Sequence, residues 1–478
     1  MTAGSRRNYR VAVVGGGLAG LAAGCALSDA GFQVTLFERR PYLGGRASSY
    51  EHPGTGEIVD NCQHVLLGCC TNLVEFYKRI GVDGKIRWYD RLTFLEPGGS
   101  ASTIAPSILP APFHTALSFL RAACLSLQDK IAISTVMAAL APGNPPDDGE
   151  SFLAWLRRHR QPERAIERFW KTILVSALNE DLDRMSVPYA AQVIRESFLK
   201  SAEAGRMGVP TVPLTELYSA AGDYIQTRGG EIGLRSGVEC FRADSAGVKL
   251  YVAGKEVSFD FVIFAVPFDV LLRMLPQVGE AEPLRKNLHA FETSPITGIH
   301  LWFDREISDL DHAVLLDRTI QWMFHKSRLL ARSSPEGRRD ANATDSPGGS
   351  YVELVVSSSK TLVEKSKSEI TELAVKELCE FFPAARDAKL LKSAVIKEVN
   401  ATFSPRPGID TYRPKPETAW PRVFLAGDWT ATGWPATMEG AVRSGYLAAE
   451  AVAKTSGANS VKFLVPDLPA SGFMRWFA

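Results

Sequence analysis

The sequence has few cysteines and no excess of charge of either sign. Its seven cysteines are scattered, and Cys69 and Cys70 are adjacent rather than spaced as a zinc knuckle requires. This pattern predicts no metal site and no disulfide framework, so we expect reduced thiols. There are 54 Lys and Arg against 53 Asp and Glu, a net charge of +1 at pH 7. Nucleic acid is therefore not an expected partner, because phosphate binding calls for a basic excess.

Long hydrophobic runs are also missing. The apolar stretch from Ile131 to Pro142 is much shorter than the ~20 residues that a helix needs to cross a bilayer. The first ten residues lead directly into an apolar strand and lack the apolar region and cleavage site of a signal peptide. We therefore expect a cytoplasmic protein, and peripheral attachment to the inner face of the membrane stays open.

The remaining composition is typical of a globular protein. Of 478 residues, 45% are hydrophobic and 22% are charged, which excludes collagen-like, coiled-coil and wholly disordered chains. At about 150 residues per domain, this length predicts roughly three structural units.

The N-terminal segment has the pattern of a dinucleotide-binding βαβ unit. An apolar strand leads through a glycine turn into an Ala/Leu-rich helix, and the glycines are Gly15, Gly17 and Gly20. They permit, in that order, a tight turn, approach of the backbone to a pyrophosphate, and close packing of helix on sheet. A second strand, Gln33–Phe37, ends at Glu38, which stands where a carboxylate binds ribose hydroxyls. The alternative is a purely structural turn, and the spacing does not choose between NAD and FAD.

The residues after Glu38 do favour one cofactor. Arg39 follows it, and the loop continues through Gly44 and Gly45 to Arg46. This segment resembles the second signature of the amine oxidase and carotenoid desaturase flavoproteins, an acidic residue followed by GG-R-x-x-[ST]. Here the glycine pair exposes backbone N–H groups to a pyrophosphate, and the arginine adds a cation beside it. The resemblance implies FAD; a glycine turn with a solvated arginine is the alternative.

Segments far along the chain resemble later signatures of the same flavoproteins. A strand ends in Gly427-Asp428, and a helix opens at Met438. The resemblance assigns Gly427 and Asp428 to the ribityl-pyrophosphate region, and Thr437 and Met438 to the flavin edge, where a positive helix end stabilises reduced flavin. It also assigns the backbone of Val238 to the adenine. Core packing of Met438 and an ordinary hairpin around Val238 are the alternatives.

These resemblances imply the fold and its division into domains. We expect an α/β fold, a Rossmann-like FAD-binding domain of the amine oxidase and phytoene desaturase type, with an interleaved α+β substrate lobe. The expected parts are a discontinuous FAD-binding domain (1–85, 215–290 and 405–456), a substrate-binding lobe (86–214 and 291–404) and an apolar C-terminal tail (457–478).

Three segments narrow the resemblance, residues 60–68, 169–179 and 183–186, and the first of them is the main ground. Residues 60–68, which include Gln63-His64-Val65-Leu66-Leu67-Gly68, resemble the hydroxysqualene dehydroxylase family, although Cys62 stands where that family has glycine. Thr297 takes the place of the lysine of amine oxidases, which argues against amine oxidation. The resemblance implies FAD-dependent reductive dehydroxylation of hydroxysqualene to squalene, by hydride transfer from reduced flavin to an allylic cation, in bacterial-type squalene and hopanoid biosynthesis.

This chemistry requires a proton donor and a dry, apolar pocket. His64 is the candidate proton donor and Gln63 the candidate hydrogen-bonding positioner; a structural hydrogen bond in the loop is the alternative for His64. Glu439 is a second candidate acid, or a helix cap. The runner-up function is an oxidative polyene desaturase of the phytoene type. A third is a catalytically inactive flavin-binding partner in an isoprenoid complex.

A long-chain isoprenoid substrate must enter from a lipid phase. Two apolar segments suit this need, 108–120 and the tail 463–477, and either could enter a membrane interface, with Arg475 and Trp476 at headgroup level. Packing against the protein's own surface is the alternative. The sequence has no second complete glycine-rich βαβ unit, so it identifies no nicotinamide site and leaves the electron donor unidentified.

Overall fold

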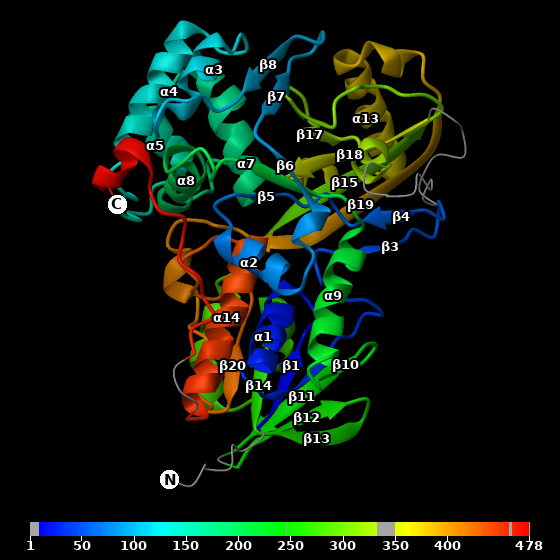
Figure 1. Ribbon diagram of the computed structural model, residues 1–478, viewed down its shortest axis with the longest axis vertical. Helices are drawn as coiled ribbons and strands as arrows, with labels where there is room; N and C mark the ends of the chain where they lie inside the picture. Colours follow the sequence, from blue (N-terminus) through cyan, green and yellow to red (C-terminus); the bar gives the residue numbers. More distant parts are fainter. Residues whose placement is uncertain (1–8, 245, 332–348, 458–460, 478) are drawn as a thin grey trace.

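Five parallel strands from distant parts of the chain form the sheet in the lower half of the molecule (Figure 1). The computed structural model describes residues 9–244, 246–331, 349–457 and 461–477. The strand order is β10 (Glu231–Gly233), β2 (Gln33–Phe37), β1 (Arg10–Val14), β14 (Phe261–Phe264) and β20 (Val423–Leu425). Each neighbouring pair is parallel. The predicted α/β fold with a Rossmann-like parallel sheet is therefore confirmed.

Helices cover this sheet closely. α1 (Leu18–Asp29) is buried from Leu18 to Ser28, and it packs against α14 (Met438–Thr455) and α9 (Leu214–Gln226). Gly445 of α14 lets the two helices approach, because a Cβ there would lie 2.2 Å from the carbonyl oxygen of Ala19. α2 (Thr71–Arg79) also packs against α14. A small antiparallel sheet extends below, formed by β11 (Val238–Ala243), β12 (Val248–Val252) and β13 (Lys255–Phe259).

The upper half contains a seven-stranded sheet and a group of helices. Its strand order is β19 (Leu390–Phe403), β15 (Thr293–Phe303), β18 (Ser350–Ser357), β17 (Trp322–Phe324), β16 (His312–Leu315), β7 (Leu92–Leu95) and β8 (Ala101–Ile104). α13 (Lys367–Phe381) packs on it and shares an apolar core with β15 and β18. The separate helical group includes α3 (Ala116–Arg121), α4 (Leu127–Leu140), α5 (Phe152–Arg158), α7 (Thr172–Leu178) and α8 (Val187–Ile194).

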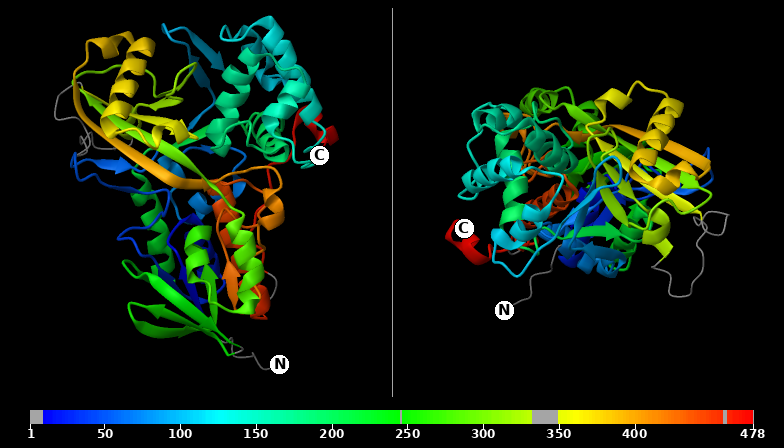
Figure 2. Two further views of the ribbon diagram at one scale, coloured as in Figure 1. Left: turned by 180° about the vertical axis from the view of Figure 1, so that it is seen from behind. Right: turned by 90° about the horizontal axis from the view of Figure 1, so that it is seen from above.

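A long strand and a small sheet lie at the junction of the two halves. The long strand β19, orange in the left view of Figure 2, passes between them and pairs with β15 over most of its length. A separate three-stranded sheet joins β5 (Leu66–Leu67) to β9 (Met207–Pro210) and β6 (Ile86–Tyr89). The segment that carries Gln63 and His64 therefore lies where the two halves meet. In the described part of the chain, no helix is both long and apolar enough to cross a bilayer.

Candidate functional site

A cavity of about 400 Å³ lies between the two halves and brings the predicted site residues together. Strand ends of the parallel sheet line one end of it, and residues of β15, β17, β18 and β19 line the other. All of the predicted site residues except Gly20 and Glu439 line this cavity, namely Gly15, Gly17, Glu38, Arg39, Gly44, Gly45, Arg46, Gln63, His64, Val238, Gly427, Asp428, Thr437 and Met438.

Bare backbone forms the floor at the sheet end of the cavity. Gly15 has a φ of +111°, a conformation that side chains rarely tolerate, and a Cβ there would lie 2.4 Å from the carbonyl oxygen of Ala265. Gly17 faces the second glycine loop, where it bridges to Gly44. Gly20 lies under the turn, and a Cβ on it would lie 1.9 Å from the carbonyl oxygen of Gly15. The two loops thus form a cradle that an extended phosphate group fits and that side chains would fill.

The carboxylate of Glu38 lies at the end of β2 and is held by backbone groups. Its Oε2 accepts a hydrogen bond of 2.7 Å from the N–H of Gly16, and its Oε1 accepts one of 2.7 Å from the N–H of Arg40. Val238 lines the cavity from the first position of β11, so it is both a hairpin residue and a wall residue. This end of the cavity has the acid and the exposed backbone that suit a ribose and an adenine.

An ion pair joins two of the predicted residues across the cavity. Arg46 Nη2 lies 2.6 Å from Asp428 Oδ1, although the residues are 382 positions apart in the chain. Arg46 also donates from Nη1 to the carbonyl oxygen of Ala401 at 2.8 Å. The pair fixes the guanidinium beside the glycine cradle, where it can meet a pyrophosphate.

The N-terminus of α14 faces the cavity through Thr437 and Met438. Thr437 is the N-cap residue, and its Oγ1 accepts a hydrogen bond of 3.0 Å from the N–H of Gly440. Met438 is partly buried and also packs against the core of the lower half, as the alternative of core packing predicted, while its place at the flavin edge stays a prediction. The positive end of an 18-residue helix therefore points at this part of the cavity.

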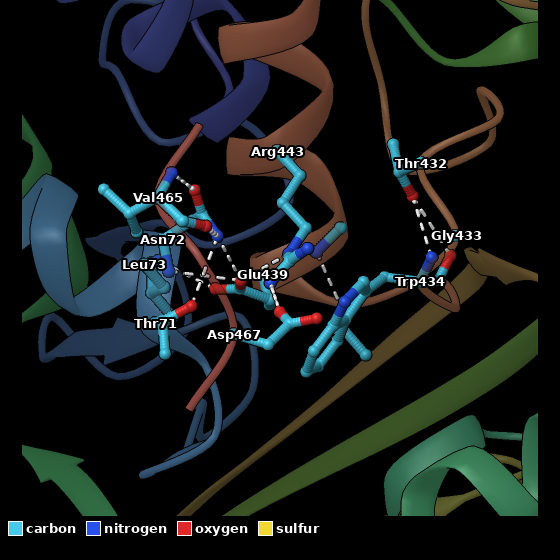
Figure 3. A network of polar contacts seen from close by, with 12 residues as sticks. Thr71, Asn72, Leu73, Thr432, Gly433, Trp434, Glu439, Arg443, Val465 and Asp467 are labelled. Atoms are coloured by element: carbon cyan, nitrogen blue, oxygen red, sulfur yellow. Dashed lines mark hydrogen bonds and ion pairs between the residues drawn. The ribbon is translucent and has the colours of Figure 1, made fainter. Parts of the chain in front are cut away.

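Glu439, the second candidate acid, does not line the cavity. It is fully buried, and its carboxylate caps the neighbouring helix α2 (Figure 3). Oε2 accepts a hydrogen bond of 2.7 Å from the N–H of Leu73, and Oε1 accepts one of 3.2 Å from the N–H of Asn72. Arg443 donates to the same carboxylate at 2.6 Å. A capping role is therefore the correct interpretation, but the helix that it caps is α2 rather than its own.

His64 lies in the cavity wall as a neutral ring. Its Nδ1 lies 2.7 Å from the carbonyl oxygen of Cys62, and since a carbonyl only accepts, Nδ1 carries the hydrogen. Burial lowers the pKa of His64 below its ordinary value. Nε2 is the ring nitrogen left to meet a substrate, and in this state it accepts a hydrogen bond. This geometry does not favour the predicted role of direct proton donor, because burial disfavours the charged ring.

Gln63 connects His64 to a group of buried charges. Its Nε2 donates to the carbonyl oxygen of His64 at 3.0 Å, and its Oε1 accepts from Lys326 Nζ at 2.8 Å. Lys326 Nζ also lies 2.6 Å from Asp60 Oδ2 and 3.4 Å from Glu353 Oε2. Lys326 and Glu353 were not predicted, because no sequence motif singles them out and they come from segments distant from Asp60.

One lysine between two buried carboxylates makes their ionisation unequal. Burial raises the pKa of Glu353 to about 8, with Lys326 opposing that rise. For Asp60, burial alone would raise the pKa, but the Lys326 charge and the hydrogen bonds to it hold it below its ordinary value. Near pH 7 the cluster therefore contains ionised Asp60, charged Lys326 and protonated Glu353, and it is neutral.

This assignment predicts a pH effect for Glu353→Gln. Between pH 4.5 and about 8 the folded protein keeps a proton on Glu353 that the unfolded chain has lost, so the stability due to this group falls as the pH rises. Glutamine does not titrate. We subtract the free energy of unfolding of the unsubstituted protein from that of the variant. We expect this difference to increase by about 2 to 4 kcal/mol from pH 5 to pH 8. Urea unfolding at both pH values measures it, and a constant difference would contradict the assignment.

The upper end of the cavity is mostly apolar. Its wall is formed by side chains from the loop after Gln63, from α7 and from the large sheet, namely Val65, Ala177, Ile296, Trp322, Phe324 and Val355. Glu398 of β19 also lines the cavity and has no counterpart among the sequence predictions. Thr297 does not line it; its hydroxyl donates to Ser359 Oγ at 2.9 Å in the sheet interior. The arrangement suits a long apolar molecule that reaches a few polar groups.

Comparisons with known proteins agree with this architecture. A family model described as flavin containing amine oxidoreductase matches residues 18–453. The chain is 28% identical over 471 residues to a 15-cis-phytoene desaturase of Synechococcus elongatus, covering 93% of this chain and 95% of that protein. It is 27% identical to a probable zeta-carotene desaturase of the same organism, covering 93% and 98%. An oxidoreductase from Methanosarcina mazei, 19% identical, superposes with a TM-score of 0.70 over 91% of this chain and 98% of that one.

Proposed function

The chain belongs to the flavin-containing amine oxidoreductase family, and from this premise we propose that it reductively removes the hydroxyl group of hydroxysqualene to form squalene. Its cofactor is FAD, and it is an oxidoreductase. The observation that carries the proposed dehydroxylation is that one cavity joins a glycine cradle to an apolar end, with His64 in the wall.

The residues of the cavity fit FAD in an extended form. In the proposed arrangement the glycine loops and Arg46 hold the pyrophosphate, Glu38 meets the adenosine ribose, and Asp428 lies by the ribityl chain. Thr437 and Met438 present the start of α14 to the ring edge, where the helix dipole favours negative charge. Bound FAD, when reduced, supplies a hydride to the substrate.

The chain's own residues then perform the rest of the reaction. The apolar wall excludes water, which would otherwise recapture the allylic cation that forms when the hydroxyl leaves as water. His64 Nε2 accepts a hydrogen bond from the substrate hydroxyl and so fixes the carbon that loses it. Gln63 holds the backbone at His64 in place, because its amide is fixed between Lys326 and the carbonyl oxygen of His64. The carboxyl of Glu398, in the same wall, is the group that we propose as proton donor.

We expect His64→Ala to slow the chemical step about 10- to 100-fold, since an oriented hydrogen bond to the reacting group is lost. Single-turnover reoxidation of the prereduced enzyme by hydroxysqualene measures this step. The matched control is His52→Ala, a loop histidine that does not line the cavity and whose pKa is also lowered by burial. An unchanged rate in the His64 variant would remove the residue from the mechanism.

A second candidate function is oxidative desaturation of a polyene. The observation that favours it is the similarity over nearly the whole chain to proteins named as phytoene and zeta-carotene desaturases. The same apolar wall suits a linear polyene, and the hydride would pass in the opposite direction, from substrate to oxidised cofactor.

Two anaerobic incubations distinguish the functions. Purified holoenzyme is reduced and mixed with hydroxysqualene in one, and oxidised holoenzyme is mixed with 15-cis-phytoene in the other. Squalene in the first supports dehydroxylation, and additional conjugated double bonds in the second support desaturation. If both incubations leave the substrates unchanged, the proposal of catalysis fails and a flavin-binding partner in an isoprenoid complex becomes the better description.

A further inference from the structure

The two apolar segments noted in the sequence meet on one surface. Phe473 donates its backbone N–H to the carbonyl oxygen of Ala111 at 2.8 Å, and its ring lies 6.1 Å from that of Phe113. Gly472 lies so close that a Cβ there would be 2.6 Å from the Ala111 carbonyl oxygen. In Figures 1 and 2 the C-terminal segment, coloured red, lies beside the cyan helical group. The tail therefore packs on segment 108–120 rather than lying apart from it.

This joined surface exposes large apolar side chains. We call it the tail surface, and its exposed members are Ile108, Leu109, Phe113, Leu117, Leu120, Phe473, Trp476 and Phe477. Trp476 is 78% exposed, and Ile108 is fully exposed. Leu127 and Ile131 are also exposed on α4, which packs against α3. An apolar group of this extent on one region marks a surface that binds something.

The tail is held in place by partly buried polar contacts (Figure 3). Asn72 Oδ1 accepts a hydrogen bond of 2.9 Å from the N–H of Val465, and Arg443 forms an ion pair with Asp467. Arg443 also packs under the ring of Trp434, 4.6 Å from its centroid. Because this network fixes residues 465–467 to α2 and α14, the terminal 3-10 helix Gly472–Phe477 is delivered to a defined place on the surface.

The charged side chains around the tail surface indicate which kind of partner it binds. Between Glu96 and Asp147 the only carboxylate in the sequence is that of Asp129, which is buried, whereas Arg121 and Arg475 are exposed. Two carboxylates beside Phe477, Glu196 and Asp467, are paired with Lys200 and Arg443. The tail surface thus combines apolar and aromatic side chains with unopposed cations, which complements an anionic phospholipid bilayer.

We propose that the tail surface is a docking site for the surface of an anionic phospholipid membrane. Its aromatic and aliphatic side chains enter the boundary between headgroups and acyl chains, and the two arginines lie at the level of the lipid phosphates. Lipid binding by the tail surface requires no turnover, so it can be measured independently of the proposed chemistry.

Flotation of the holoenzyme with vesicles tests the proposal. The probes are vesicles of phosphatidylglycerol and phosphatidylcholine in equal amounts, and vesicles of phosphatidylcholine alone. We expect the holoenzyme to prefer the anionic vesicles, and the variant Phe473→Ser/Trp476→Ser/Phe477→Ser to bind them at least ten-fold more weakly. The charge variant Arg121→Gln/Arg475→Gln should lose the preference between the two vesicles while keeping weak binding.

The matched control is Val278→Ser/Leu391→Ser, which removes exposed apolar side chains outside the tail surface and should float like the unsubstituted holoenzyme. Bound flavin absorbance in every variant verifies that the fold persists. Equal flotation of the triple variant and the holoenzyme would overturn the proposal. So would a holoenzyme that binds neither vesicle but changes from dimer to monomer in the triple variant, since the surface would then join two copies of the chain.

Discussion

Lys326→Met is expected to lower the free energy of unfolding by about 3 to 5 kcal/mol, because it leaves the buried, ionised Asp60 without its cation. Lys326 is itself buried, and its Nζ lies 2.6 Å from Asp60 Oδ2. Methionine keeps most of the volume of the side chain, so the effect reports the charge rather than a cavity. Equilibrium unfolding in urea at pH 7 measures the change.

Two further variants sharpen this result. Lys85→Met removes a lysine whose ion pair with Glu216 is exposed, and it should cost less than about 1 kcal/mol. The double variant Lys326→Met/Asp60→Asn leaves no unpaired charge when Glu353 is protonated, so it should recover part of the lost stability. If Lys326→Met costs no more than Lys85→Met, the buried cluster does not have the charges that we assign to it.

Gly20→Ala is expected to weaken FAD binding at least 100-fold. The added Cβ would lie 1.9 Å from the carbonyl oxygen of Gly15, a backbone atom that cannot move unless the whole glycine turn moves. The turn would then leave the position from which its N–H groups meet a pyrophosphate. Titration of the apoprotein with FAD, followed by the quenching of flavin fluorescence, gives the change in affinity.

Gly24→Ala provides the comparison within the same helix. Its Cβ would lie 2.7 Å from Cδ1 of Ile225, the flexible end of a side chain that can rotate away. We expect near-normal FAD affinity and only a modest loss of stability. Equal FAD affinity in the two variants would mean that the turn above Gly20 does not contribute to cofactor binding.

Some features of this protein are fixed by local sequence. The glycine turns are predictable because a positive φ at Gly15 and a Cβ-free approach at Gly20 are requirements of single positions. The parallel strands are predictable for a similar reason, since a strand buried on both faces, such as β14, reads as a short continuous apolar run. The βαβ unit therefore followed from patterns of adjacent residues, and the cofactor and the fold class followed from the family resemblance that such patterns carry.

Other features were decided only by tertiary structure. Lys326 reaches Asp60 across 266 positions, Glu439 caps α2 rather than its own helix, and the tail packs against Ala111. The sequence singled out Gln63 and His64, but it did not show that Gln63 is held between Lys326 and His64, or that Glu398 shares their cavity. Periodicity reports which face of an element is buried, whereas the partner that an isolated charge meets depends on how distant elements pack, and the local sequence does not encode this.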